Sequence, residues 1–273
     1  MNNFEELVSK YISYIKERID SAEIITHPFP HMVIDNYLPQ EMYQFIMEAY
    51  PGKYEMVNPY NKARTYKNIW QLDIVADPFV KGGEDNAWHY SNHLTHDNKT
   101  FVMCELVERV MFSQELTELW KKKLLVTTNL NLIQVGRLAI DGYGAGLGPH
   151  VDRDDKCISN VLYLAKGHEP SIECGTHLLE PKTNKVKKDL IGVTDHQTYD
   201  DFTITKTVEY VPNRLIAWKV VPESWHSYHQ TFDGDRRSIK FFIQEDLADY
   251  SDLRAEKELS AVFSQDWKDS NRS

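Results

Sequence analysis

The chain has 273 residues, and its 31 Lys and Arg against 41 Asp and Glu give a formal net charge of −10. A chain of this length buries roughly 75% of its unfolded surface, so we expect a globular protein. The acidic balance argues against nucleic acid and anionic membranes as partners, because both recruit basic chains. No apolar run approaches the ~20 residues of a membrane span. The first residues also lack the order of a signal peptide, so we expect a cytoplasmic protein; its oligomeric state is unknown.

Residues 1–123 are predicted to form a helical supporting region. Apolar residues at helical spacing run through 4–19, a short strand is expected at 32–35, and a helix begins near Pro39. A second long helix is expected over 101–122, because the lysine run that closes it suits a helix carboxyl end. Three widely spaced cysteines without CxxC spacing predict free thiols rather than disulfides or a zinc site.

From residue 124 the pattern changes to short β-rich runs separated by turn-forming residues. These runs cover 124–128, 130–140, 158–164, 208–211, 215–221 and 238–244. They favour a β-sandwich or barrel, and we place one catalytic core at 124–247 with a C-terminal extension at 248–273. The polar stretch 165–207 is longer than an ordinary connection, and we interpret it as a lid in preference to an inserted hairpin.

A glycine-rich stretch at 142–149 precedes the tripeptide His150-Val151-Asp152. Its glycines do not have GxGxxG spacing, which excludes a dinucleotide-binding loop. In an extended segment, residues i and i+2 face the same way, so His150 and Asp152 can reach one cation. An HxD tripeptide is expected by chance on the order of once in such a chain, so it needs context.

The context is His226 and the strand that follows it, which begins with Arg236-Arg237-Ser238. Two histidines and one carboxylate make the facial triad that holds Fe(II) and leaves coordination positions open. An arginine can clamp a carboxylate with two parallel hydrogen bonds, and Ser238, on the same face as Arg236, can add a third. The arrangement therefore fits a dicarboxylic co-substrate.

In this order and spacing, the residues His150, Asp152, His226 and Arg236 resemble the Fe(II)- and 2-oxoglutarate-dependent dioxygenases, in particular their prolyl-hydroxylase-like branch. The resemblance covers about 130–245 and includes Tyr163, which corresponds to a tyrosine that contacts the distal carboxylate of 2-oxoglutarate. It implies an α+β fold with a mainly β core, a double-stranded β-helix (a cupin-like jelly roll), with supporting N-terminal helices. It also implies Fe(II), 2-oxoglutarate and O2 as cofactors and co-substrates, with ascorbate as a stimulant.

Two of these assignments have competitors. His229 competes with His226 as the second histidine ligand, but the ten-residue spacing to Arg236, which is the spacing of the family, favours His226. Arg237 competes with Arg236 as the carboxylate clamp; strand alternation lets only one of them point inward, and we favour Arg236. Tyr143 is a candidate for the C1 carboxylate of the co-substrate.

We expect hydroxylation of an unactivated C–H bond of a small-molecule substrate, with decarboxylation of 2-oxoglutarate to succinate and CO2. The alternatives are a prolyl or peptidyl hydroxylase, a catalytically silent cupin-like binding module, and a zinc hydrolase that uses the same triad.

Overall fold

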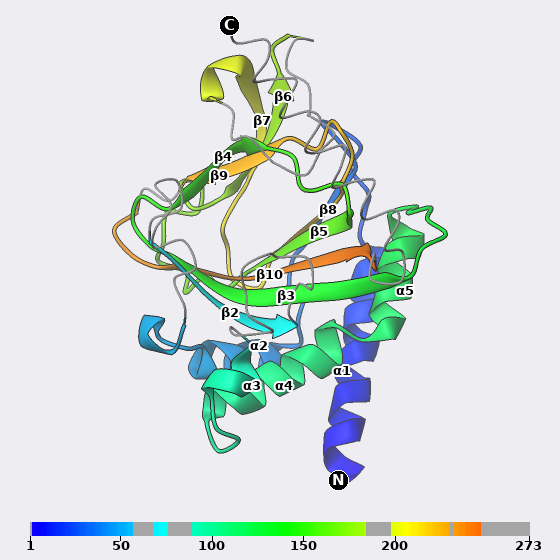
Figure 1. Cartoon of the computed structure of the whole chain (residues 1–273), viewed down its shortest axis with the longest axis vertical. Helices are drawn as coiled ribbons and strands as arrows, with labels where there is room; N and C mark the ends of the chain where they lie inside the picture. The colour runs from blue at the N-terminus through cyan, green and yellow to red at the C-terminus, as the bar shows by residue number, and fades with distance from the viewer. Residues whose placement is uncertain (1, 57–67, 76–88, 184–197, 230–231, 247–273) are drawn as a thin grey trace, which may run out of the picture.

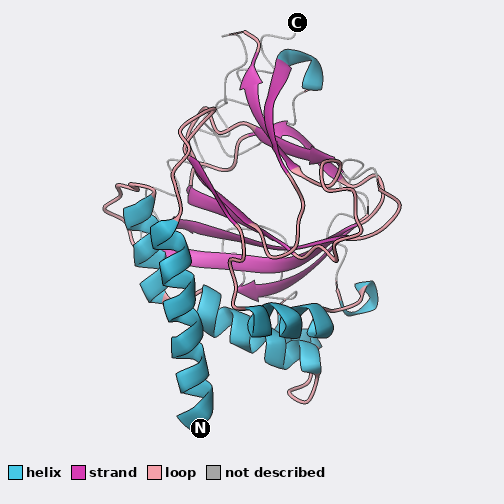
Figure 2. Cartoon of the chain, turned by 180° about the vertical axis from the view of Figure 1, so that it is seen from behind, coloured by secondary structure: helices cyan, strands magenta, loops and turns pink. Residues whose placement is uncertain are grey.

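The computed structural model describes residues 2–56, 68–75, 89–183, 198–229 and 232–246. Two antiparallel β-sheets face each other, and the helices pack against the outer side of the larger sheet (Figure 1). The view from behind shows the same layers, with the long helices on the side of the larger sheet and a short helical turn at the opposite end of the β-structure (Figure 2). Within the described residues, no helix combines the length and the apolar character needed to cross a membrane.

The larger sheet has six strands and the smaller has four. In spatial order the larger contains β1 (His31–Ile34), β8 (Leu215–Lys219), β5 (Lys156–Tyr163), β10 (Arg236–Glu245), β3 (Leu132–Asp141) and β2 (Ile69–Val75). The smaller contains β4 (Gly146–His150), β9 (His226–His229), β6 (Thr176–Pro181) and β7 (Phe202–Val208). From β3 to β10 the chain alternates between the two sheets, except for β6 and β7, which are consecutive strands of the smaller sheet; this is the order of a jelly roll, as the resemblance implied.

The helices and the larger sheet share one hydrophobic core. The helices are α1 (Asn2–Ser21), α2 (Gln40–Ala49), α3 (Tyr90–His93), α4 (Lys99–Met111) and α5 (Gln114–Lys123), with short 3-10 turns η1 (Lys53–Glu55) and η2 (Tyr199–Asp201). Ile15 of α1, Val107 of α4 and Phe241 of β10 are all fully buried in this core. Burial of such a continuous apolar surface stabilises the packing of the helices on the sheet.

Alternation along β10 gives the larger sheet two different faces. Ile239, Phe241 and Ile243 are fully buried in the core that includes the helices. Arg236 and Ser238 belong to the opposite face, which looks toward the smaller sheet, because successive side chains of a strand point to opposite faces. This inward face is where the strands place most of their charged side chains.

The helix predicted over 101–122 is wrong as a single element. The chain forms two helices, because α4 ends at Met111 and α5 starts afresh after Ser113. The Ser113 hydroxyl caps α5 by accepting a hydrogen bond from the backbone N–H of Leu116. The strand predicted at 124–128 is also wrong, since Leu124 is the C-cap of α5 and a turn follows.

The lid predicted at 165–207 is corrected by the topology. This stretch contains β6 and β7, which are strands of the smaller sheet, and β6 pairs with both β7 and β9. The polar composition of β7 has a simple cause: it is an edge strand, and most of its residues are exposed or half-buried. Residues 184–197 of the predicted lid lie outside the described residues.

Candidate metal and carboxylate-binding site

The three residues of the predicted metal triad lie together. His150 is the last residue of β4 and His226 the first of β9, and the two are paired across the smaller sheet. Asp152 follows two residues after His150. One ligand atom from each of the three residues lies within 4.8 Å of the other two, and all three residues are buried. The structure therefore brings together the three residues that the sequence nominated as metal ligands.

Both imidazoles are oriented by backbone carbonyls. The Nδ1 atom of His150 lies 2.7 Å from the carbonyl oxygen of Gly148, and Nδ1 of His226 lies 3.0 Å from that of Ser224. A carbonyl oxygen only accepts hydrogen bonds, so each Nδ1 carries the proton and each Nε2 is the nitrogen suited to a metal. The Nε2 atom of His226 lies 3.6 Å from an Asp152 carboxylate oxygen.

The carboxylate of Asp152 is held by two donors from β5. Ser159 donates to Oδ2 at 2.7 Å and Lys156 donates to Oδ1 at 3.0 Å. Burial alone would raise the pKa of Asp152, but the charge of Lys156 and the hydrogen bond from Ser159 help to outweigh it and hold the pKa well below its ordinary value. The group is therefore an ionised ligand, fixed before any metal arrives.

This donor set fits Fe(II) by its chemistry. Two neutral imidazoles and one carboxylate, gathered on one side of a point, leave the opposite side open for other ligands. Trp218 covers one side of the group, since its ring centroid lies 4.5 Å from that of His226. The hydrogen bonds to Gly148, Ser224 and Ser159 give each ligand the support from neighbouring groups that metal-binding residues usually have.

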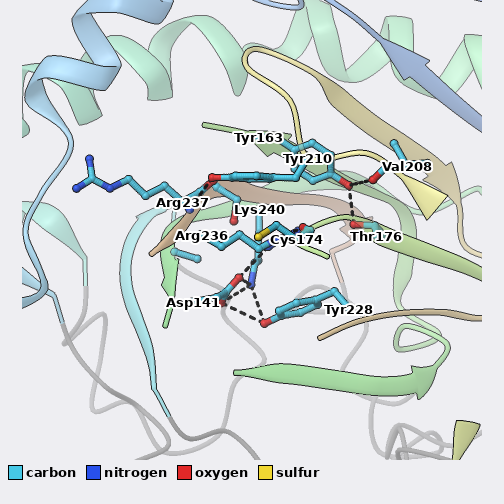
Figure 3. A network of polar contacts seen from close by, with 12 residues as sticks. Asp141, Tyr163, Cys174, Thr176, Val208, Tyr210, Tyr228, Arg236, Arg237 and Lys240 are labelled. Carbon is cyan, nitrogen blue, oxygen red and sulfur yellow. Dashed lines mark hydrogen bonds and ion pairs between the residues drawn. The ribbon is translucent and has the colours of Figure 1, made fainter. Parts of the chain in front are cut away.

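The predicted carboxylate clamp, Arg236, is present but already paired. Its guanidinium donates from Nη1 to Asp141 at 2.8 Å and from Nε to the carbonyl oxygen of Cys174 at 2.7 Å (Figure 3). The side chains of Arg236 and Asp141 are 1% and 0% exposed. The rings of Tyr163, Tyr210 and Tyr228 lie within 5.4 Å of the guanidinium carbon.

Asp141 receives a second cation. Lys240 donates to the Asp141 carboxylate at 3.1 Å, and the hydroxyl of Tyr228 donates to it at the same distance (Figure 3). Burial would raise the pKa of Asp141, but the charges of Lys240 and Arg236 outweigh burial and lower it. The inward face therefore carries an ionised Asp141 between two cations. The group of Asp141, Arg236 and Lys240 has a net charge of one positive unit.

The other predicted residues are placed as follows. Ser238 is fully buried, and its hydroxyl has no hydrogen-bond partner among the described residues. Tyr163 lies beside Arg236 and donates its hydroxyl to Thr176 Oγ1 at 2.7 Å. Arg237 points to the other face, with its guanidinium over the ring of Tyr50.

Two candidates from the sequence lie at the surface. His229 is exposed at the end of β9. Tyr143 is 62% exposed in the turn before β4, where Gly144 adopts a φ of 74° that favours glycine.

Asp141, Lys156 and Lys240 were missed by the sequence reasoning. Lys240 had a usable signal, because it stands two residues after Ser238 and four after Arg236 and must share their face. Asp141 had none, since its position opposite Arg236 depends on the register between β3 and β10.

A scan against protein-family models and a search of curated proteins found no match. Solved structures do match. A prolyl-4-hydroxylase from Pseudomonas putida aligns with a TM-score of 0.52 and 17% identity, over 85% of this chain and 99% of that chain. This similarity confirms the predicted jelly-roll fold.

Two further structures are similar at lower scores. A prolyl hydroxylase from Trichoplax adhaerens, in complex with a peptide fragment of a hypoxia inducible factor oxygen degradation domain, has a TM-score of 0.49 and 15% identity, over 89% of this chain and 91% of that chain. HygX from Streptomyces hygroscopicus, with nickel, 2-oxoglutarate and hygromycin B bound, has a TM-score of 0.47 and 9% identity, over 79% and 82%.

Proposed function

We propose that the chain is an Fe(II)- and 2-oxoglutarate-dependent oxygenase. One observation carries the proposal: His150, Asp152 and His226 present one ligand atom each within 4.8 Å, inside a fold shared with a prolyl-4-hydroxylase. The triad alone would also suit zinc. Two nearly buried cations on the face of the larger sheet that looks toward the smaller sheet, Arg236 and Lys240, favour a metal site that also takes a dicarboxylate.

The residues that would hold the metal are His150, Asp152 and His226. When bound, Fe(II) with 2-oxoglutarate and O2 supplies the oxidising power: 2-oxoglutarate becomes succinate and CO2, one oxygen atom enters succinate, and the other enters a C–H bond of the substrate. The protein orients the side chains that would bind the metal. Ser159 and Lys156 hold the Asp152 carboxylate in one orientation, and the carbonyls of Gly148 and Ser224 fix the two rings.

The co-substrate would be held by Arg236, with Ser238 and Tyr163 beside it. The Ser238 hydroxyl is a buried donor without a partner among the described residues, so a carboxylate would satisfy it. Asp141 neutralises only one of the two cations that contact it, Arg236 and Lys240. A second carboxylate is therefore electrostatically favoured there, although it must share the cations with Asp141.

The substrate class is proposed as a small molecule that is hydroxylated at an unactivated C–H bond. The charged side chains that face the smaller sheet support a site with several converging polar groups, which is typical of a small-molecule pocket. A prolyl or other peptide substrate is the alternative, and it would require an open groove for an extended chain.

Succinate release tests the proposal. The purified full-length chain receives Fe(II), ascorbate, 2-oxoglutarate and O2, first alone, then with pools of small metabolites, and in parallel with proline-containing peptides. We expect succinate formation that small metabolites raise more than peptides do, and that His226→Ala abolishes. The matched control is His168→Ala, which removes an exposed histidine that is not one of the three proposed ligands. Stimulation by peptides alone would favour the alternative, and no succinate under any condition would favour a binding module.

A further inference from the structure

Three cations stand in a group on the inward face of the larger sheet. Lys240 of β10 and Arg137 of β3 are paired in register, so their side chains leave the same face of the sheet. Lys156, at the start of β5, lies with its ammonium group 3.4 Å from the ring centroid of Phe242, another residue of this face. The proposed metal site is adjacent, because Lys156 contacts Asp152.

Each of these cations is largely removed from water and pairs with an acidic side chain that the structure describes. The side chains of Arg137, Lys156 and Lys240 are 13%, 12% and 12% exposed. Lys156 pairs with Asp152 at 3.0 Å and Lys240 with Asp141 at 3.1 Å. Arg137 has the weakest ion pair, since its Nε lies 3.5 Å from Asp73, outside hydrogen-bond geometry, and this Nε has no hydrogen-bond partner among the described residues. Its Nη1 donates a hydrogen bond to Gln71 at 3.1 Å, so the Nε edge of the guanidinium is the edge open to a ligand.

Placing these charges together costs free energy. Like charges directly opposite on neighbouring strands destabilise a sheet, and that is the relation of Arg137 to Lys240. Burial lowers the pKa of Lys240 and outweighs the opposing effect of Asp141, and the nearby charges of Arg236 and Arg137 lower it further. Apolar side chains would fill the same space without this cost, so the cations are better explained by a ligand than by the fold.

The balance of charge identifies the sign of that ligand. The nearly buried charges that the structure describes on this face or in contact with it are four cations and three carboxylates, a surplus of one positive charge: Arg137, Lys156, Arg236 and Lys240 against Asp73, Asp141 and Asp152. Fe(II) adds two positive charges and 2-oxoglutarate adds two negative charges, so the surplus of one survives loading of the site. A substrate with one negative charge completes the balance.

We propose that Arg137, flanked by Lys240 and Lys156, binds a carboxylate of the primary substrate, which is therefore a small carboxylic acid. The proposal rests on the proposed function, because the substrate is defined by its place beside the metal and the co-substrate. A guanidinium suits a carboxylate because its planar fork donates two parallel hydrogen bonds. The net charge of −10 gives the whole chain no general attraction for anions, so selection of an acid depends on these local cations.

A binding measurement on the full-length chain tests this proposal. The protein is kept anaerobic with Fe(II) and saturating 2-oxoglutarate, so that no turnover occurs. Ligand-observed NMR then compares small carboxylic acids with their own primary amides, pair by pair. We expect acids to bind about tenfold or more tightly than their amides, because a hydrogen bond between charged groups is lost in each amide.

The main variant is the double substitution Asp73→Asn with Arg137→Gln. It removes the two partners together, so that no buried charge remains alone. We expect it to abolish the preference for acids. Lys240→Gln is a second variant that should reduce the preference if the double variant does not fold. The control, Lys10→Gln, removes one positive charge from the exposed side of α1 and should change nothing.

The same samples distinguish a failure of the proposed substrate-carboxylate site from a failure of the proposed oxygenase function. The visible charge-transfer band of Fe(II) with 2-oxoglutarate reports the metal and co-substrate site, and it should persist in the double variant. If wild type lacks the band, the proposed function fails. If the band is present but acids bind no better than amides, or no pair binds at all, or the double variant keeps the preference, the carboxylate site is overturned.

Discussion

The carboxylate of Asp141 and the guanidinium of Arg236 form an ion pair of 2.8 Å in which the side chains are 0% and 1% exposed. They are opposite each other on β3 and β10. Lys240, four residues after Arg236 on the same face of β10, also pairs with Asp141. An ion pair withdrawn so completely from water is costly to break, because either partner alone would be a buried, uncompensated charge. The residue proposed to clamp the co-substrate is thus held in place by a carboxylate of the protein itself.

Replacing Asp141 with Asn should lower stability and tighten co-substrate binding. The substitution leaves Arg236 and Lys240 without an anion, which we expect to cost the metal-free protein about 3 kcal/mol of unfolding free energy. The same loss removes a competitor for both cations, so the Kd for 2-oxoglutarate should fall about tenfold. Thermal melting with and without 2-oxoglutarate measures both effects, since a ligand of the native state raises Tm.

Asp35→Asn is the control for this experiment. Asp35 also pairs with an arginine, Arg214, but it is 56% exposed. Exposed pairs contribute roughly 0–1 kcal/mol, so the Tm should change little and the response to 2-oxoglutarate should not change. Equal 2-oxoglutarate binding by wild type and Asp141→Asn would show that Asp141 does not share its cations with the co-substrate.

Ser238→Ala should weaken 2-oxoglutarate binding without weakening the fold. The hydroxyl of Ser238 is fully buried and makes no hydrogen bond among the described residues, so its removal takes away no internal bond. A hydrogen bond to a carboxylate contributes about 1.5–3 kcal/mol, which corresponds to a Kd raised roughly tenfold or more. Calorimetric titration and melting curves measure the two quantities. A lower Tm with an unchanged Kd would assign Ser238 to the fold alone.

Ser159→Ala should lower metal affinity. Ser159 is as buried as Ser238, but its hydroxyl bonds to the Asp152 carboxylate at 2.7 Å. Loss of such a supporting bond typically costs about 10–100-fold in metal affinity. Anaerobic Fe(II) titration provides the measurement, and Ser238→Ala serves as its control because that variant should bind Fe(II) normally. An unchanged Fe(II) affinity in Ser159→Ala would mean that Asp152 needs no support from β5.

The stability of the metal-free protein should depend on Asp141 at low pH. The pKa of Asp141 is lowered in the folded protein, whereas in the unfolded chain it lies near its ordinary value of about 3.9. The stabilisation is therefore present above about pH 4 and is lost as the pH falls through the lower, folded pKa. Between pH 5 and 3 the Tm of wild type should fall more steeply than that of Asp141→Asn. Parallel curves would contradict an ionised Asp141.

Sequence patterns identified site residues that are related by their spacing along the chain better than site residues that come together only through the fold. His150 and Asp152 belong to one extended segment, and the spacing to Arg236 that the family resemblance implies favoured His226 over His229. Strand alternation also placed Arg236 and Arg237 on opposite faces, as the structure shows. These predictions needed only local geometry or spacing.

Contacts between strands could not be predicted in this way. Asp141 and Arg137 meet their partners through the register of β3 with β10 and β2, which no local pattern specifies. The edge strand β7 is polar because one side of it has no neighbouring strand, and it therefore resembled a loop. The break between α4 and α5 could have been predicted from Ser113, which is a favourable N-cap residue. It was overlooked because the apolar pattern continues across it.

The most direct measurement is an anaerobic visible spectrum of the chain with Fe(II), before and after addition of 2-oxoglutarate. Joint binding of both at the triad predicts a charge-transfer band that appears only when both are present. The band should be absent from His226→Ala and should need a much higher 2-oxoglutarate concentration in Arg236→Lys, in which the fork of donors is lost. A wild-type spectrum without the band at saturating Fe(II) and 2-oxoglutarate would contradict the oxygenase function.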